Sequence, residues 1–248
     1  LRELVARGLV KEMTDMETLG VFEPIAASEQ QPGDLVVPSR LLLRRKAPGV
    51  VRVRLVAQQV NTGVWANAFA PTPSSTSVRL LLALAMLLGW TIQIGDVSCA
   101  FPHAPVEAGS RRTLIRPPRS VSDARILWIL LKALYGMRES PRLWSEFWST
   151  VMQQTGFKRS VTDPQVYSRA DAYLLAHVDD ILLVAAPASL EQIMVDIGAA
   201  VRMKWLGRVT DQEWSTYLGR EYRLCPQGFR VRMPPAFHTS ILKVVGFT

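Results

Sequence analysis

Two adjacent carboxylates, Asp179 and Asp180, lie between two apolar runs at residues 173–175 and 181–184. Apolar runs on both sides of a short polar step predict a hairpin with the two acids at its tip. Like charges at this separation repel, and loss of water adds to the cost. A divalent cation would relieve both penalties, and hard oxygen ligands suit Mg²⁺.

A third carboxylate, Asp96, ends another apolar run at residues 91–94. Two metal ions held about 3.5–4 Å apart for an in-line displacement need such an additional ligand. We therefore interpret Asp96, Asp179 and Asp180 as a candidate two-metal centre. Taken alone, the Asp179–Asp180 pair is equally typical of an ordinary turn, where Asp is common.

The composition is that of a globular, basic protein. Of its 248 residues 48% are hydrophobic, the formal net charge is +8 and the pI is about 9.9. Such a charge fits contact with phosphate backbones. Residues 35–95 contain no Asp or Glu. Basic residues gather there and in a second cluster: Arg40, Arg44, Arg45, Lys46, Arg52, Arg54 and Arg79, then Arg111, Arg112, Arg116 and Arg119.

Two cysteines without a CxxC motif exclude a disulfide framework, and they fit a reducing compartment inside the cell. The longest apolar run, residues 80–88, is too short to span a bilayer, so no membrane association is expected. The first residues do not resemble a signal peptide and include no initiating Met. We expect a piece of a longer polyprotein.

Local patterns predict helices and strands without a regular strand–helix–strand order, which indicates an α+β fold. Arg52 and Arg54 alternate with apolar residues, as in a strand with one wet, basic face. The run 78–90 is expected to be a buried helix with its N-cap among Ser74–Ser77. Helices are also predicted within 1–22, from Pro141 onward and over 190–203; strands are predicted over 35–37, 50–56 and 91–97, on both sides of Asp179 and within 214–231.

Several short motifs, in one order along the chain, resemble the reverse transcriptases of copia-type LTR retrotransposons. Each motif is weak by itself, but the ordered set over about residues 16–246 is specific. The motifs are R-L-V-A-Q (54–58), F-A-P (69–71), V-R-L-L-L-A-L-A (78–85), the segment 90–101, L-Y-G-M-R-E-S-P-R-L-W (134–144), G-F with Ser160, Asp163 and Val166-Tyr167, H-V-D-D (177–180) and Y-L-G (217–219).

The resemblance implies a right-hand polymerase fold with fingers, palm and part of a thumb. Residues 16–248 would form the reverse transcriptase domain, with fingers and palm over roughly 16–186 and the end of the palm and start of the thumb over 187–248. Residues 1–15 would be a helical extension. The enzyme would be an RNA-directed DNA polymerase within a retrotransposon Pol polyprotein, in a cytoplasmic virus-like particle or the nucleus.

The same resemblance assigns roles. Its catalytic residues would be Asp96, Asp179 and Asp180, which with Val97 would hold two Mg²⁺ ions, Mn²⁺ being an alternative. The incoming deoxynucleotide would contact Arg52, Arg54, Phe101, Tyr135 and Gly136; Arg52 and Arg54 would hold its triphosphate and Phe101 would exclude a 2′-hydroxyl. Partners would be an RNA or DNA template-primer, dNTPs and other Pol domains, with any RNase H after residue 248.

The chain departs from the family pattern at three places. His177 replaces the usual Tyr, Glu139 replaces the usual Gln near the nucleotide pocket, and Pro102-His103 replaces the usual Leu-Asn. These changes leave open a second hypothesis, a catalytically decayed remnant that still binds nucleic acid. A third is a two-metal phosphohydrolase unrelated to polymerases, which would need no arginines on the fingers.

Overall fold

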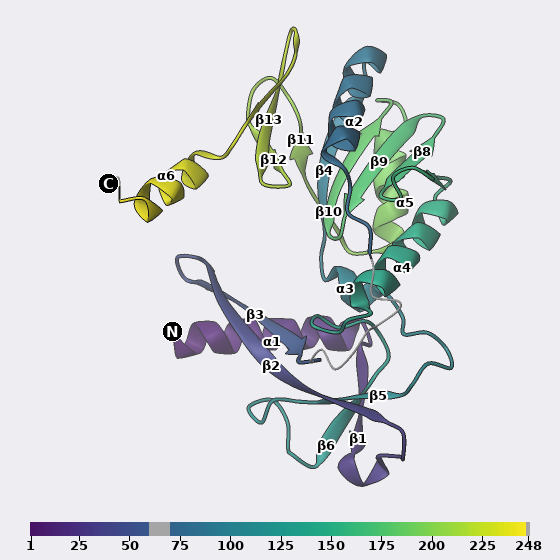
Figure 1. The fold of residues 1–248 in the computed structure, drawn as a ribbon, viewed down its shortest axis with the longest axis vertical. Coiled ribbons are helices and arrows are strands. Elements are labelled where there is room, and N and C mark those ends of the chain that lie inside the picture. Colours follow the sequence, from purple (N-terminus) through teal and green to yellow (C-terminus); the bar gives the residue numbers. More distant parts are fainter. Residues whose placement is uncertain (60–69, 247–248) are drawn as a thin grey trace. The chain divides into compact units, whose positions relative to one another are not determined.

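The computed structural model describes residues 1–59 and 70–246, so Phe69 of the F-A-P motif lies outside the described residues. The chain divides into two compact units (Figure 1). Unit 1 comprises Leu1–Ala70 and Cys99–Trp148, and unit 2 comprises Pro71–Ser98 and Ser149–Thr248.

Unit 1 is built on a five-stranded sheet in the order β1-β6-β5-β2-β3. Neighbouring strands are antiparallel except β2 and β5, which are parallel. The strands are β1 (Phe22–Ala26), β2 (Leu35–Ala47), β3 (Val50–Ala57), β5 (Thr113–Arg116) and β6 (Ile126–Leu130). The helices are α1 (Arg2–Thr18), the 3₁₀ turn η1 (Ala27–Glu29), α3 (Ala100–His103) and α4 (Ser140–Gln154), which begins in this unit.

Helix α1 confirms the predicted N-terminal helix and packs against β3. It runs through Met16 to Thr18, so the predicted boundary between residues 15 and 16 falls inside it. Met16 is fully buried and belongs to the same core as Leu55 of β3 and Ile115 of β5. Helix α1 is therefore packed into the core of unit 1.

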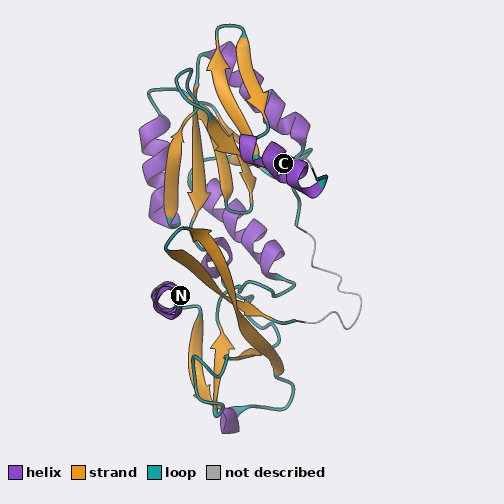
Figure 2. Ribbon diagram, turned by 90° about the vertical axis from the view of Figure 1, so that its left-hand side faces the viewer, coloured by secondary structure: helices purple, strands orange, loops and turns teal. Residues whose placement is uncertain are grey.

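Unit 2 contains a six-stranded antiparallel sheet in the order β11-β4-β10-β9-β8-β7 and a three-stranded sheet in the order β12-β13-β14. The first sheet holds β4 (Thr91–Val97), β7 (Lys158–Arg159), β8 (Val166–Arg169), β9 (Ala172–His177), β10 (Asp180–Ala185) and β11 (Met203–Arg208). The second holds β12 (Ser215–Tyr217), β13 (Arg220–Cys225) and β14 (Gly228–Arg232). The helices are α2 (Ser75–Leu88), α5 (Leu190–Ala200) and α6 (Pro235–Val244). Figure 2 shows helices on both sides of the larger sheet.

The central strands of the larger sheet are buried on both of its faces. Ile92 and Ile94 of β4 and Leu182 of β10 share a core with Leu81 of α2 and Tyr217 of β12. Side chains two residues apart on a strand lie on one face. The end of this face beyond Ile94 therefore carries the next residue in the alternation, Asp96.

Helix α2 begins as predicted, because the Ser74 hydroxyl accepts a hydrogen bond from the Ser77 amide at 3.0 Å. The expectation that this helix is wholly buried is wrong. Leu80 and Leu87 are 55% and 81% exposed, whereas Leu81 is 1% exposed. Only one side of the helix packs against the sheet. The continuous apolar run therefore led to a prediction of more burial than the helix has.

One other predicted element, helix α5, ends differently. Helix α5 stops at Ala200 instead of residue 203, because Met203 already pairs with Val97 as the first residue of β11. The tail forms the predicted strands, with Gly219 and Gly228 at positive φ.

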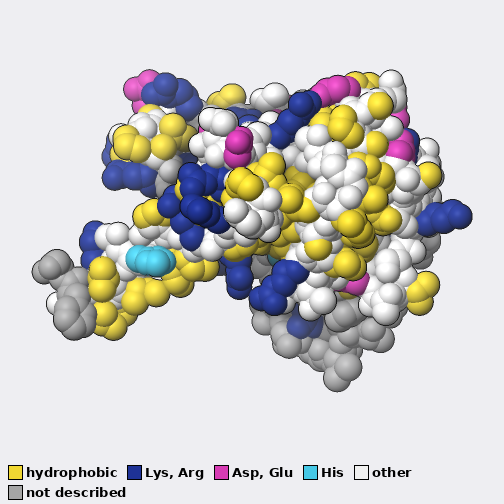
Figure 3. All heavy atoms as spheres, turned by 90° about the horizontal axis from the view of Figure 1, so that it is seen from above, with side chains coloured by type: hydrophobic (Ala, Val, Ile, Leu, Met, Phe, Trp, Pro, Cys, Tyr) yellow, Lys and Arg dark blue, Asp and Glu magenta, His cyan; other side chains and the backbone are white. Residues whose placement is uncertain are grey.

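Figure 3 shows hydrophobic side chains along one side of the C-terminal helix α6, where Phe237, Ile241, Leu242 and Val244 are exposed. No helix within the described residues is both long and apolar enough to cross a membrane.

Candidate active site

The predicted hairpin is formed by β9 and β10, with Val178 and Asp179 as its two-residue connection. His177 and Asp180 are paired across the strands. Val178 has a φ of 55°, which is rare for a β-branched residue and costs about 1–3 kcal/mol. Strain of this kind is retained where the surrounding structure enforces it, and here it fixes the two-residue tip that carries Asp179.

Strand β4 lies beside β10 and brings the third acid to the tip. Asp96 is directly opposite Asp180 in the antiparallel register, and the Val97 amide donates a hydrogen bond of 2.7 Å to the Asp179 carbonyl. Directly paired residues project from the same face of a sheet. The register therefore places the Asp96 and Asp180 side chains together, with Asp179 on the adjoining turn.

The same row extends over four strands. Lys204 of β11 pairs with Asp96, Asp96 with Asp180, and Asp180 with His177. The two acids thus stand between a lysine and a histidine on one face. The sequence alone did not identify Lys204 as a site residue, because its position beside Asp96 follows from the pairing of β11 with β4. The local signal was its place as a charged residue between Met203 and Trp205, which is typical of an alternating strand.

The acids influence one another electrostatically. Burial raises the pKa of Asp180, the neighbouring Asp179 and Asp96 raise it further, and His177 opposes them. Tyr217, 2% exposed, also has a raised pKa because of burial and the nearby Asp180 charge. Asp180 therefore sits in a site with excess negative charge, which a cation would relieve.

The donor chemistry of the site suits a hard cation, because Asp96, Asp179 and Asp180 offer carboxylate oxygens. In the conformation described, no group of three or more His, Cys, Asp or Glu side chains among residues 1–59 and 70–246 is arranged to hold a metal ion. Val97 is 1% exposed, so the metal role predicted for it falls to its backbone carbonyl. The backbone pairing brings the three acids to one end of the sheet, and metal ligation by these residues stays a prediction.

The predicted substrate residues of unit 1 form a separate group. The Arg54 guanidinium carbon lies 4.4 Å from the centre of the Tyr135 ring, and the Phe101 and Tyr135 ring centres are 5.4 Å apart. Burial raises the pKa of Tyr135 to about 12, against the opposing influence of Arg54. Three residues far apart in the sequence thus form one cluster, with the guanidinium over the Tyr135 ring and the two aromatic rings tilted against each other. We call Arg54, Tyr135 and Phe101 the arginine–aromatic cluster.

Backbone contacts hold Tyr135 and Gly136 against β3. The Ala57 amide donates a hydrogen bond of 2.7 Å to the Tyr135 carbonyl. A Cβ atom on Gly136, whose φ is +83°, would lie 2.0 Å from the Ala57 carbonyl oxygen. Only glycine permits this approach, so Gly136 serves the packing of the turn whatever it contributes to a substrate.

Arg52 occupies the same side of β3 as Arg54, because Val53, Leu55 and Ala57 are the buried set. It is exposed and lies opposite Arg44 of β2 in the strand register. The structure therefore gives Arg54 an aromatic partner, and it places Arg52 among other arginines on the wet side of the strand.

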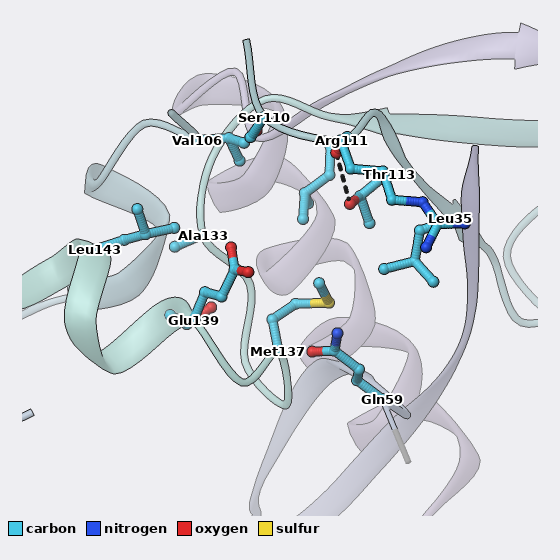
Figure 4. Close-up of a pocket in the computed structure, with 12 residues that line it drawn as sticks. Leu35, Gln59, Val106, Ser110, Arg111, Thr113, Ala133, Met137, Glu139 and Leu143 are labelled. Atoms are coloured by element: carbon cyan, nitrogen blue, oxygen red, sulfur yellow. Dashed lines mark hydrogen bonds between the residues drawn. The ribbon is translucent and has the colours of Figure 1, made fainter. Parts of the chain in front are cut away.

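The two other departures from the family pattern take defined places in unit 1. Glu139 lines a pocket of about 200 Å³, into which Figure 4 shows its carboxylate pointing, near Met137 and Ala133. The lining of this pocket does not include the arginine–aromatic cluster. The expectation that Glu139 lies near the nucleotide pocket stays a prediction. His103 is buried, with its ring centre 6.4 Å from that of Trp144.

The fold and the sequence now define the class of protein. Residues 38–248 match the family described as reverse transcriptase (RNA-dependent DNA polymerase), and the chain belongs to this family. The expected right-hand polymerase fold agrees with a solved foamy viral protease-reverse transcriptase in complex with dsDNA. That structure is 15% identical, with a TM-score of 0.50 over 95% of this chain and 43% of that chain.

Curated relatives specify the group. The chain is 29% identical over 189 residues to the retrovirus-related Pol polyprotein from transposon RE2 of Arabidopsis thaliana, covering 73% of this chain. It is 28% identical over 190 residues, again 73% of this chain, to that of transposon RE1. With transposon TNT 1-94 of Nicotiana tabacum it shares 29% identity over 148 residues, 56% of this chain. These matches span 13%, 12% and 11% of the respective polyproteins. The chain is a reverse transcriptase domain of the retrotransposon Pol kind.

Proposed function

We propose that this domain is an RNA-directed DNA polymerase that adds deoxynucleotides to a primer 3′-hydroxyl by two-metal catalysis. The observation that carries the proposal is the register of β4 and β10, which pairs Asp96 with Asp180 beside Asp179 in a member of this family. Catalysis would then consist of positioning and charge neutralisation.

In this proposal different residues of the chain bind the metal ions, the triphosphate and the sugar. Asp96, Asp179 and Asp180, with the Val97 carbonyl, would hold Mg²⁺ ions, which supply charge neutralisation at the transferred phosphate. Arg54 and Arg52 would hold the triphosphate of the dNTP. Phe101 would restrict the sugar, as the family resemblance implies.

We further propose a template-primer of RNA or DNA as the main partner, with other Pol domains in the parent polyprotein. The net charge of +8 and the arginines of β2 and β3 support a polyanionic partner. A cytoplasmic particle or the nucleus is the proposed setting.

The test is primer extension on a poly(rA) template with Mg²⁺, comparing wild type with Asp179→Asn. Asp211→Asn is the matched control, because Asp211 is an exposed acid of the same unit. We expect Asp179→Asn to lower the rate by on the order of 10²–10³-fold or more and Asp211→Asn to leave it unchanged. Equal rates for wild type and Asp179→Asn would refute the proposal. Template binding by a wild type that performs no synthesis would instead identify a non-catalytic remnant.

A further inference from the structure

Strand β3 is the last strand of the unit 1 sheet, so one of its edges has no strand partner among residues 1–59 and 70–246. An open strand edge exposes unpaired amides and carbonyls, which proteins cover with other elements. Helix α1 covers this edge. A Cβ atom on Gly8 of α1 would lie 2.6 Å from the Val51 carbonyl oxygen, so only glycine allows the helix this close.

A helix cannot complete the ladder of such an edge with its own backbone, because its interior carbonyls already accept bonds within the helix. Glu12 supplies the missing acceptor with its side chain. Its Oε1 atom accepts a hydrogen bond of 2.9 Å from the Leu55 amide. Glu12 is 7% exposed and Leu55 is fully buried, so the bond is formed out of water.

The anchored amide belongs to the residue next to Arg54. Leu55 points into the core, so Arg54 must point to the other side, where its guanidinium stacks on Tyr135. Two residues further along, the Ala57 amide binds the Tyr135 carbonyl. Thus the α1 contact and the arginine–aromatic cluster fix neighbouring positions of one short strand.

We propose that Glu12 is a positioning residue: its carboxylate anchors the edge of β3 at Leu55 and thereby holds Arg54 against Tyr135 in the geometry that receives a triphosphate. The triphosphate part rests on the proposed function, whereas the anchoring does not. Glu12 lies outside residues 38–248, the part that matches the family, so nothing in that match assigns it a role.

The experiment compares Glu12→Leu, which removes the acceptor, with Glu12→Gln, which keeps an oxygen at the same position. Glu17→Leu is the control for adding a leucine to α1, because Glu17 is exposed on the same helix. Amide hydrogen exchange of Leu55 and Ala57 reports anchoring without any need for catalysis. Exchange at Leu114 and Ile115, buried in the same unit, reports whether a variant is folded.

We expect faster exchange at Leu55 and Ala57 in Glu12→Leu, with Leu114 and Ile115 still protected. Glu12→Gln and Glu17→Leu should keep the protection of the Leu55 and Ala57 amides. In primer extension, Glu12→Leu should raise the KM for dNTP by roughly tenfold to a hundredfold, since displacements of about 1 Å carry costs of that order. Its kcat and its KM for template-primer should change much less.

Unchanged exchange at Leu55 or Ala57 in Glu12→Leu would overturn the anchoring. Faster exchange with an unchanged KM for dNTP would overturn the link to the triphosphate. A Glu12→Leu chain that exchanges everywhere is unfolded, and then Glu12→Gln decides: loss of Leu55 protection there contradicts the proposal, and retained protection supports it. A wild type that performs no synthesis would refute the proposed function, while the exchange result would still decide the anchoring.

Discussion

Asp96 and Asp180 face each other as a direct cross-strand pair between β4 and β10, and Asp179 lies in the turn beside them. Two acids in such a position destabilise a sheet unless something offsets their charge. Lys204 and His177 flank the pair in the same row. This arrangement is typical of a ligand-binding site, in which the bound ligand offsets a repulsion that lowers the stability of the unliganded protein.

The raised pKa of Asp180 predicts that its ionised carboxylate opposes folding when no metal is present. A group with a raised folded-state pKa contributes stability at low pH that is lost as the pH rises through that value. Asp180→Asn should therefore raise the Tm at neutral pH in EDTA. Mg²⁺ should raise the Tm of wild type more than that of Asp180→Asn. A lower Tm for Asp180→Asn in EDTA would contradict this electrostatic account.

Arg54→Lys tests the arginine–aromatic cluster. Lysine keeps the charge but lacks the planar guanidinium that stacks on Tyr135 and binds phosphate in two places. We expect the KM for dNTP to rise several-fold with little change in Tm. Arg45→Lys, an exposed arginine on β2, is the matched control and should have no effect on either quantity. Equal KM values for the two variants would remove the proposed role of Arg54.

Gly136→Ala should destabilise unit 1 more than backbone conformation alone explains. Gly109, in the same unit, has a similar positive φ of 77° but open space where a Cβ would lie. Gly109→Ala should cost about 1–3 kcal/mol for the strained φ. Gly136→Ala adds a clash with the Ala57 carbonyl and should cost more than this. Urea unfolding of both variants measures the difference in their free energies of unfolding. Equal losses of free energy would contradict the prediction, because they would show that the Ala57 carbonyl can move away from the new Cβ atom without destabilising unit 1.

Glu12 should make stability depend on pH. Burial raises its pKa above the ordinary value of 4.5, with Asp15 adding to this and the Leu55 amide, Arg54 and Arg52 opposing it. The stabilisation is therefore present at low pH and is lost as the pH rises through the folded-state pKa. The stability of Glu12→Gln relative to wild type should increase with pH and then level off. Urea unfolding between about pH 4 and pH 8 tests this, and a difference that shrinks with pH would contradict it.

Local patterns were enough to locate most elements and the candidate acids. The apolar run before Asp96 predicted the strand Thr91–Val97 with its observed bounds, and Ser74 was rightly placed among the caps of α2. The ordered motifs predicted the reverse transcriptase family, and the family match over residues 38–248 confirms this prediction. These features are encoded within a few residues of one another, through alternation, capping groups and turn chemistry.

Pairing between distant segments could not be read in this way. The register that sets Asp96 opposite Asp180, the placement of Lys204 beside them, and the bond from Leu55 to Glu12 all depend on which strands and helices become neighbours. The one-sided burial of α2 and the pocket around Glu139 depend on it as well. Hydrophobic burial, which is non-directional, selects these neighbours over the whole chain, so only the folded structure reveals which buried acid meets which amide or charge.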